Sequence, residues 1–162
     1  MTAPTFESLL DRYQAEIMAY IVRSLGDHEL AQDVFQETFL RAFRAYRGLS
    51  AVANPRAWLY KIASNACHDA RRRQARRPLP LEEAAAVADR RYGADRELAG
   101  AVVAFVRLLP RRQRQALVLR KFQDMGYDEI AGALGCTPEA ARASVYQALR
   151  KVRAHFAEVI DG

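Results

Sequence analysis

The sequence has few of the residues that build metal, redox or catalytic sites. Its 162 residues include two cysteines and three histidines, and no two cysteines are spaced as CxxC. A metal site is therefore not expected, and the lone thiols of Cys67 and Cys136 are expected to be small buried side chains in a reducing compartment. No nucleotide-binding glycine motif is present, and the histidines lie in no recognisable nucleophile context. We expect neither an enzyme nor a bound cofactor.

Long apolar runs and strand patterns are missing as well. No stretch approaches the roughly 18 apolar residues that span a bilayer, and the N-terminus has no basic region followed by an apolar run. We expect a cytoplasmic protein without membrane insertion and, since nothing follows Gly162, without a C-terminal regulatory domain. Alternation of apolar and polar residues never persists, whereas spacings of three and four recur. The predicted fold class is all-α.

The charge that is present has an uneven distribution. The formal net charge is +6, with +8 in residues 44–79, +4 in residues 100–162 and −4 in residues 1–43. Two basic blocks separated by acidic ones indicate two separate contacts with a polyanion. A modest basic excess is also common in proteins that have no such partner.

The most informative pattern is residues 126–141, which predict a helix, a tight turn and a second helix opened by Thr137 and Pro138. Such a helix-turn-helix can place its second helix, about 138–153, in a DNA major groove. Opposite the apolar stripe of that helix lie Glu139, Arg142, Ala143, Tyr146, Gln147 and Arg150. Arg142 and Gln147 are candidates for base contacts, and Arg150, Lys151 and Arg153 for phosphate contacts. The alternative is a solvated helix face.

The remaining pattern predicts two small helical domains, 1–77 and 97–162, joined by a flexible linker at 78–96 with an optional short helix at 82–91. Helices are expected at about 5–24, from the Asp27 cap onwards, and at 55–74, with a loop at 47–55. Phe43, Leu98 and Phe122 are expected on buried faces.

Aromatic and basic residues are mixed in the third predicted helix and the segment before it. Tyr46, Trp58 and Tyr60 lie among Arg44, Arg47, Arg56, Lys61 and Arg71. Rings that stack on bases and cations that follow the backbone suit single-stranded nucleic acid. Core aromatics beside solvated arginines explain the same pattern, and the two interpretations stay open.

Three segments together resemble bacterial extracytoplasmic-function (ECF) sigma factors of the sigma-70 family. Residues 26–43 (GDHELAQDVFQETFLRAF) resemble the family's second conserved region, and residues 55–72 (PRAWLYKIASNACHDARR) resemble its continuation. Residues 109–119 and the helix-turn-helix resemble its fourth region. The resemblance implies a subunit that binds core RNA polymerase, at the largest-subunit coiled coil and the flap region, and directs it to promoter DNA, both duplex and melted. An anti-sigma factor is a further implied partner.

The resemblance also implies a role for individual residues. The polymerase-binding residues would be Asp33, Gln36 and Glu37, with Phe39 packing beside them. Contacts with the melted −10 element would come from Arg47, Ser50, Asn54, Arg56, Trp58, Lys61, Asn65, Arg71, Arg72 and Arg73. Contacts with the −35 element would come from Thr137, Glu139, Arg142, Ala143, Ser144, Tyr146, Gln147, Arg150 and Lys151.

Two other classes of protein stay open at this point. A stand-alone helix-turn-helix regulator would bind duplex DNA without polymerase, but it would need neither the acidic second helix nor the basic, aromatic third helix. A protein-interaction module would use the basic faces to bind an acidic partner and would be insensitive to promoter sequence.

Overall fold

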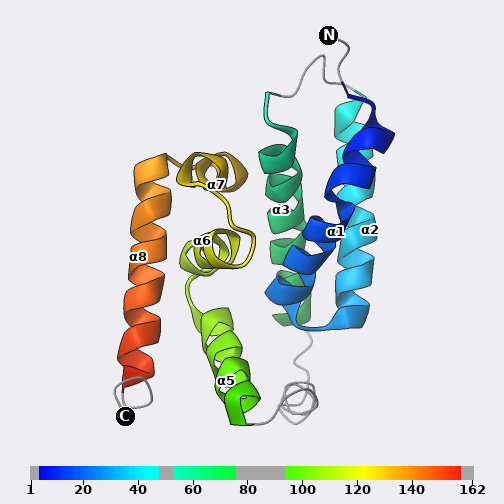
Figure 1. The fold of residues 1–162 in the computed structure, drawn as a ribbon. Helices are drawn as coiled ribbons and strands as arrows, with labels where there is room; N and C mark the ends of the chain where they lie inside the picture. Colours follow the sequence, from blue (N-terminus) through cyan, green and yellow to red (C-terminus); the bar gives the residue numbers. More distant parts are fainter. Residues whose placement is uncertain (1–3, 48–52, 76–93, 158–162) are drawn as a thin grey trace.

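The computed structural model describes residues 4–47, 53–75 and 94–157, which form seven α-helices. These ranges contain no strand, so the predicted all-α class is confirmed. The first group of helices is α1 (Phe6–Leu25), α2 (His28–Tyr46) and α3 (Pro55–Ala75). The second group, which lies beside α3 in Figure 1, is α5 (Ala94–Leu108), α6 (Arg111–Lys121), α7 (Tyr127–Leu134) and α8 (Pro138–His155).

Local chemistry sets the ends of these helices as the sequence predicts. Gly26 ends α1 in the left-handed conformation, with φ of 73°, and its N–H donates to the Val22 carbonyl at 2.8 Å. The Asp27 carboxylate then accepts from the backbone N–H groups of Glu29 and Leu30, at 3.0 and 3.2 Å. These bonds satisfy donors that the first turn of α2 leaves without intrahelical partners.

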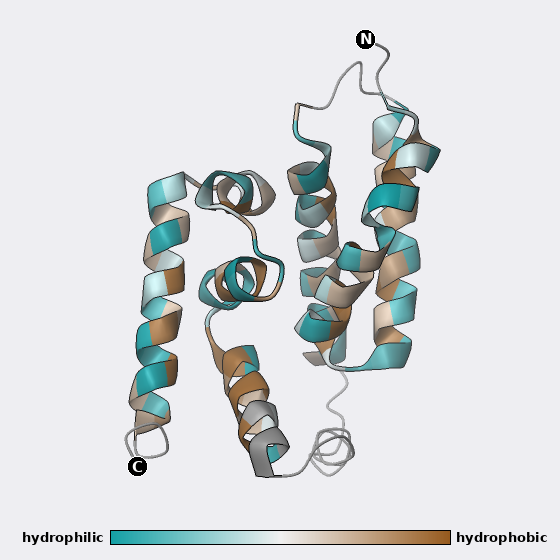
Figure 2. Cartoon of the chain, in the orientation of Figure 1, coloured by the Kyte–Doolittle hydropathy of each residue, from teal (hydrophilic) through white to brown (hydrophobic). Residues whose placement is uncertain are grey.

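The buried apolar side chains of both groups form one continuous cluster. Tyr20 and Tyr60 are fully buried, with ring centroids 5.2 Å apart, and the Tyr20 hydroxyl is hydrogen-bonded to the Ser64 hydroxyl at 2.8 Å. Leu119 and Met125 extend the cluster into the second group. Figure 2 shows the matching pattern, with hydrophobic residues on the faces of the helices that meet.

The two groups of helices are in direct contact. The largest contact between them is α3 against α7, and α1 also packs on α6. Helix α5 begins at Ala94, so the last three residues of the predicted linker are helical. The optional helix at 82–91 lies outside the described residues. Within the described ranges, no helix has the length and apolar character needed to cross a membrane.

Three apolar residues expected on buried faces are instead partly exposed: Phe43 at 40%, Leu98 at 38% and Phe122 at 50%. Phe43 packs edge-on against Phe6 at the rim, at 5.3 Å between ring centroids. Phe122 follows the last turn of α6 and is covered on one side by the Arg23 guanidinium, 5.3 Å from its ring centroid. Hydrophobic periodicity shows which face of a helix packs inward, but it does not show how much of that face the neighbouring elements cover.

Candidate functional site

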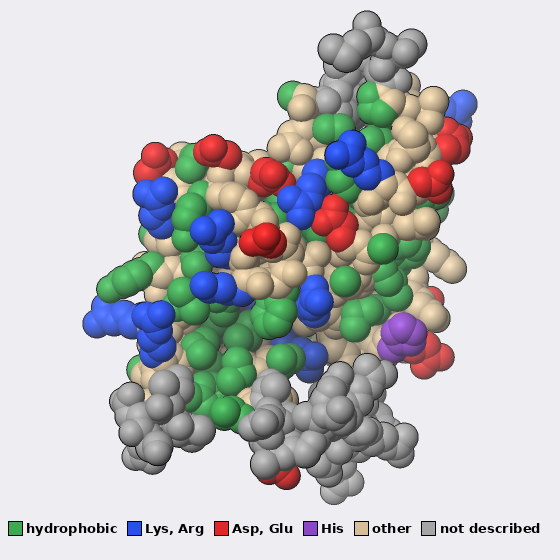
Figure 3. Space-filling model, in the orientation of Figure 1, with side chains coloured by type: hydrophobic (Ala, Val, Ile, Leu, Met, Phe, Trp, Pro, Cys, Tyr) green, Lys and Arg blue, Asp and Glu red, His purple; other side chains and the backbone are tan. Residues whose placement is uncertain are grey.

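Helix α8 presents a polar face along its whole length. Its exposed residues include seven of those predicted to contact DNA: Glu139, Arg142, Ala143, Tyr146, Gln147, Arg150 and Lys151. Tyr146 is 64% exposed. In Figure 3, Lys and Arg side chains line the α8 edge of the molecule. The face is therefore basic and open to a polyanion.

A short turn fixes α8 to the preceding helix. Gly135 has φ of 68°, and its N–H donates to the Ala131 carbonyl, which ends α7. Two residues later, the Thr137 hydroxyl accepts from the Ala140 N–H at 3.1 Å and caps α8. The predicted helix-turn-helix is confirmed in its geometry, and the hydroxyl of Thr137 serves the cap.

Contacts from α6 and α7 position two of the candidate DNA-reading side chains. The Arg142 guanidinium lies over the Tyr127 ring, 5.0 Å from the centroid, and Arg120 lies over the same ring at 4.6 Å. The Gln147 side-chain carbonyl accepts from the Gln113 amide at 3.1 Å. Gln147 keeps its amide donors for another partner.

Ser144 is a correction to the predicted set. Its side chain is 7% exposed and lies on the same side of α8 as Ala141, Val145 and Ala148, which are buried. The helical period of 3.6 residues turns this position towards the domain core rather than towards solvent. Ser144 therefore does not belong to the exposed face.

A second candidate surface lies on α2. Asp33 and Gln36 are exposed, and Leu40 is 48% exposed. Together with Glu37 and two cations of the next turns, Arg41 and Arg44, they line a shallow hollow. Phe39, one position before Leu40, is 8% exposed and packs inward as expected. An apolar side chain among charges suits contact with another protein.

Glu37 also links α2 to α3. Its carboxylate accepts from Arg41 and, at 3.3 Å, from Arg73 of α3. Partial burial acts to raise the pKa of Glu37, but the hydrogen bonds from Arg41 and Arg73 outweigh it and lower the pKa. The Glu37 carboxylate is thus charged, and it already accepts hydrogen bonds from Arg41 and Arg73.

The aromatic residues of the basic region are mainly packing residues. Tyr60 is fully buried, and half-buried Trp58 packs against the core cluster. The Tyr46 ring lies 6.2 Å from that of Trp58 and 5.8 Å from that of Phe6. Their mutual packing favours the core interpretation over an open stacking platform.

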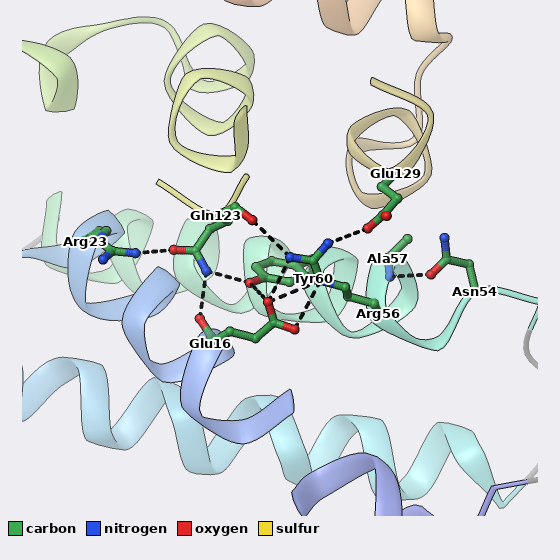
Figure 4. A network of polar contacts seen from close by, with 8 residues as sticks. All are labelled: Glu16, Arg23, Asn54, Arg56, Ala57, Tyr60, Gln123 and Glu129. Atoms are coloured by element: carbon green, nitrogen blue, oxygen red, sulfur yellow. Dashed lines mark hydrogen bonds and ion pairs between the residues drawn. The ribbon is translucent and has the colours of Figure 1, made fainter. Parts of the chain in front are cut away.

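Arg56 faces the second group of helices instead of an open surface. Its guanidinium donates to both carboxylate oxygens of Glu16, at 2.9–3.2 Å, and to Glu129 of α7 at 2.7 Å. It also donates to the Gln123 carbonyl at 3.0 Å. Figure 4 shows these groups converging on Arg56. The hydrogen bond to Glu16 raises the pKa of Arg56 against the opposing effect of burial, so the side chain stays charged.

Asn65, another predicted −10 contact, is occupied in a similar way. Its side-chain carbonyl accepts from Arg111 of α6 at 3.1 Å. Lys61, one turn earlier, is exposed and shares a small pocket with Asn65, Arg111 and Arg112. This side of α3 therefore faces α6 and α7 across a cationic pocket.

The three arginines at the end of α3 do not act alike. Arg72 and Arg73 are exposed, whereas Arg71 turns inward and donates to the Ser24 carbonyl at the end of α1. Burial, and then the charges of Arg114 and Arg107, lower the pKa of Arg71 to about 10. Arg71 therefore does not share the exposed surface of Arg72 and Arg73, because the C-terminus of α1 supplies a buried acceptor that attracts the cation.

The loop before α3 is described only at its ends. Arg47 is exposed and lies over the Phe43 ring at 5.6 Å. Asn54 uses its side-chain carbonyl to accept from the Ala57 N–H at 3.1 Å, which leaves its amide donors available. Ser50 lies outside the described residues.

Sequence reasoning missed the residues that join the two groups of helices, namely Gln123, Glu129 and Arg111, and the half-buried Arg107 and Arg114. Gln123 lies in the turn between α6 and α7, and the others stand at ordinary polar helix positions, so only a view of both groups reveals them. Among the described residues, no cluster of His, Cys, Asp and Glu could hold a metal ion.

Comparison with known families assigns the two groups of helices separately. Residues 9–77 match sigma-70 region 2, and residues 99–152 match sigma-70 region 4. The sigma-H factor of RNA polymerase from Pseudomonas aeruginosa is 32% identical over 88% of this chain and 81% of its own length. The sigma factor CarQ of Myxococcus xanthus is 29% identical over 95% of this chain and 90% of its own.

Two solved structures share the fold. CnrH in complex with the cytosolic domain of CnrY is 26% identical, with a TM-score of 0.67 over 94% of this chain and 88% of that one. The sigma factor RpoE in complex with the anti-sigma factor NepR, from Bartonella quintana, has a TM-score of 0.69 over 92% of this chain and 94% of that one. At 19% identity, this second match shows the fold alone.

Proposed function

Since this chain belongs to the ECF sigma factors of the sigma-70 family and directs promoter-specific initiation of transcription, we propose that its two halves make separate contacts. Residues 1–77 dock on core RNA polymerase and capture the melted −10 element. Residues 97–162 read the −35 element in duplex DNA, and residues 78–96 link the two halves.

The observation that carries this proposal is the exposed basic face of α8 in a capped helix-turn-helix. A helix held by its neighbours at both the turn and the core can enter a major groove without reorganising. Arg142 and Gln147 suit base edges, while Arg150 and Lys151 suit phosphates. Glu139, Ala143 and Tyr146 complete the face.

The α2 surface supports polymerase docking. Asp33 and Gln36 are exposed, and Leu40 adds apolar area beside them. Electrostatic attraction from such a surface steers association, and the apolar contact adds affinity. The coiled coil of the largest subunit is the proposed partner of this surface, and the flap region is the proposed partner of residues 97–162.

The −10 element is captured by the cations and amides of the first half that are open to solvent. These are Arg47, Lys61, Arg72 and Arg73, together with the amide of Asn54. Ser50 would add a donor in the loop. Arg56 and Asn65 join this set once they leave their partners in α6 and α7.

An anti-sigma factor is proposed as a regulating partner in the cytoplasm. The related RpoE was solved in complex with one, and CnrH in complex with the cytosolic domain of CnrY. RpoE and CnrH share the fold of this protein over more than nine-tenths of its length.

Run-off transcription with purified core RNA polymerase tests the proposal. Genomic fragments from the source bacterium are transcribed with and without the protein, and its binding to core polymerase is measured in parallel. We expect new transcripts with defined start sites that require the protein, and those start sites give the promoter sequences.

The opposite result would favour another class of protein. Absence of transcripts together with absence of polymerase binding would indicate a stand-alone regulator, and its binding to duplex DNA would then be measured directly.

A further inference from the structure

Helix α6 supplies a contact that orients one of the candidate DNA-reading side chains of α8. Gln113 lies in the first turn of α6, and its side-chain amide donates to the side-chain carbonyl of Gln147 at 3.1 Å. Helices α6 and α8 share the most extensive helix packing in the described part of the chain. The relative position of the two glutamines is therefore fixed by the core of the second half.

The environment of Gln113 decides which way its amide points. The side chain is half-buried, and its carbonyl oxygen is buried without a hydrogen-bond partner among the described residues. Turning the amide over would bury an NH2 group, which has two donors to satisfy, in place of this oxygen. Buried N–H groups without partners are rarer in proteins than buried carbonyl oxygens without partners. The orientation in which Gln113 donates to Gln147 is therefore the favoured one.

This hydrogen bond gives the Gln147 amide a direction. Its carbonyl oxygen faces Gln113, and its NH2 group, on the opposite side of the same carbon, points away from Gln113. Gln147 is exposed, as are Ala143 and Arg150, its neighbours about one turn away on the same face of α8. Gln147 therefore offers donors, in preference to an acceptor, to a molecule bound on this face.

The edges of the DNA bases differ in how well they receive such a donor. In the major groove, guanine presents two acceptors, N7 and O6, whereas adenine presents the N7 acceptor beside the N6 donor. A Gln side chain pairs with adenine by donating to N7 and accepting from N6. To do so, Gln147 must share or give up its hydrogen bond with Gln113. Donation to guanine leaves that bond intact.

Entry into a groove increases the weight of this difference. In the free protein the hydrogen bond between the two glutamines is open to solvent, so water can replace either partner. A DNA groove displaces that water, and a Gln113 amide that lost its acceptor there would be left without a partner. The cost of this unpaired donor falls on the adenine complex and not on the guanine complex.

We propose that Gln113 is a positioning residue for promoter recognition, which sets the base preference of Gln147 to guanine over adenine in the −35 element. The proposal rests on the proposed function, because Gln147 must enter the major groove to read a base. Gln113 acts through Gln147, so its replacement should change which base is preferred at one base pair and leave the preferences at the other base pairs unchanged.

Two substitutions of Gln113 test the direction of the hydrogen bond. Gln113→Lys supplies donors only and should keep the carbonyl of Gln147 turned towards α6. Gln113→Glu supplies acceptors only, so the NH2 group of Gln147 should turn towards it and the carbonyl should face the groove. Arg112→Gln is the matched control for charge, because it lowers the net charge by the same one unit at an exposed, adjacent position.

The measurement uses the whole chain with core RNA polymerase. Run-off transcription from a promoter library, with each base pair of the −35 element varied, gives the relative use of the four bases at every position. Gln147→Ala identifies the base pair that depends on Gln147. At that base pair we expect the wild type, Gln113→Lys and Arg112→Gln to use guanine over adenine by roughly fivefold or more. Gln113→Glu should reverse the preference, towards adenine or cytosine, whose exocyclic amino groups are donors.

The outcomes separate the positioning role from the proposed function, once circular dichroism has verified that each variant is folded. Preference of the wild type for another base at this base pair, or guanine preference retained by Gln113→Glu, would overturn the positioning role. Unchanged base preferences in Gln147→Ala, with transcripts that still require the protein, would overturn it too and leave the proposed function in place. Absence of transcripts and of polymerase binding with the wild type would overturn the proposed function itself.

Discussion

At the residue scale, Arg142 can be distinguished from the other cations of α8. It is the cation of the exposed face whose guanidinium rests on an aromatic ring, that of Tyr127. Such a contact limits its rotamers before DNA arrives, which lowers the entropic cost of a bidentate contact with guanine.

Arg142→Ala tests whether this side chain reads a base. We expect it to weaken binding to the matched −35 sequence by roughly 1–3 kcal/mol, with a smaller loss on mismatched sequences. Competition binding with a library of duplexes gives both values. Arg150→Ala is the comparison, since loss of a phosphate contact should weaken all sequences alike. An equal loss across sequences for Arg142→Ala would make it a phosphate contact.

The two cysteines should differ sharply in reactivity. Burial raises the pKa of the Cys67 thiol to about 12, against a small lowering by Arg71 and Arg114, whereas Cys136 is half-buried. A raised pKa leaves the thiol protonated at all lower pH values, so the reactive thiolate is scarce. At pH 8, we expect iodoacetamide to modify Cys136 and spare Cys67 in the folded protein, by mass spectrometry. Modification of both at equal rates without denaturant would contradict this burial.

At the element scale, α2 depends on a single capping side chain. Asp27 satisfies two backbone donors of its first turn and follows the left-handed Gly26 directly. The same helix carries the proposed polymerase surface, so its N-terminal stability and its function are linked.

Removal of the cap should have a measurable cost. We expect Asp27→Ala to lower the free energy of unfolding by about 1 kcal/mol, and the melting temperature by about 2–4 °C. Urea denaturation followed by circular dichroism gives the value. Asp27→Asn retains the acceptor and should stay close to the wild type. If Asp27→Asn lowered the free energy of unfolding as much as Asp27→Ala does, the stabilisation would come from the charge and not from the hydrogen bonds.

At the scale of the whole molecule, charge is segregated between surfaces that face different partners. The α8 edge is basic, whereas Asp33 adds an exposed acid to α2. Glu37 is less suitable for mutation because its replacement would also release Arg41 and Arg73.

Asp33→Lys tests the polymerase surface without this complication. We expect binding to core polymerase to weaken about tenfold or more, because a cation replaces an acid in a complementary interface. Asp11→Lys makes the same charge change at an exposed position of α1 and should bind normally. Normal binding by folded Asp33→Lys would remove Asp33 from the docking surface.

Much of this protein was determined by its sequence alone, because the controlling interactions are local. Helix period, the caps at Asp27 and Thr137, and the turns at Gly26 and Gly135 each depend on residues within one or two turns. The polar face of α8 follows from the same period, and the order of the motifs indicated the family.

Only the tertiary structure decided which polar side chains are free. Arg56, Asn65 and Arg71 are ordinary cations and amides in the sequence. In the structure, carboxylate and carbonyl groups up to 73 positions away accept from Arg56 and Arg71, and the Arg111 guanidinium donates to Asn65. Ser144 is next to exposed residues of α8, but a shift of one position along the helix is enough to point its side chain into the core. Hydrogen bonding between distant helices depends on their packing geometry, which sequence periodicity does not contain.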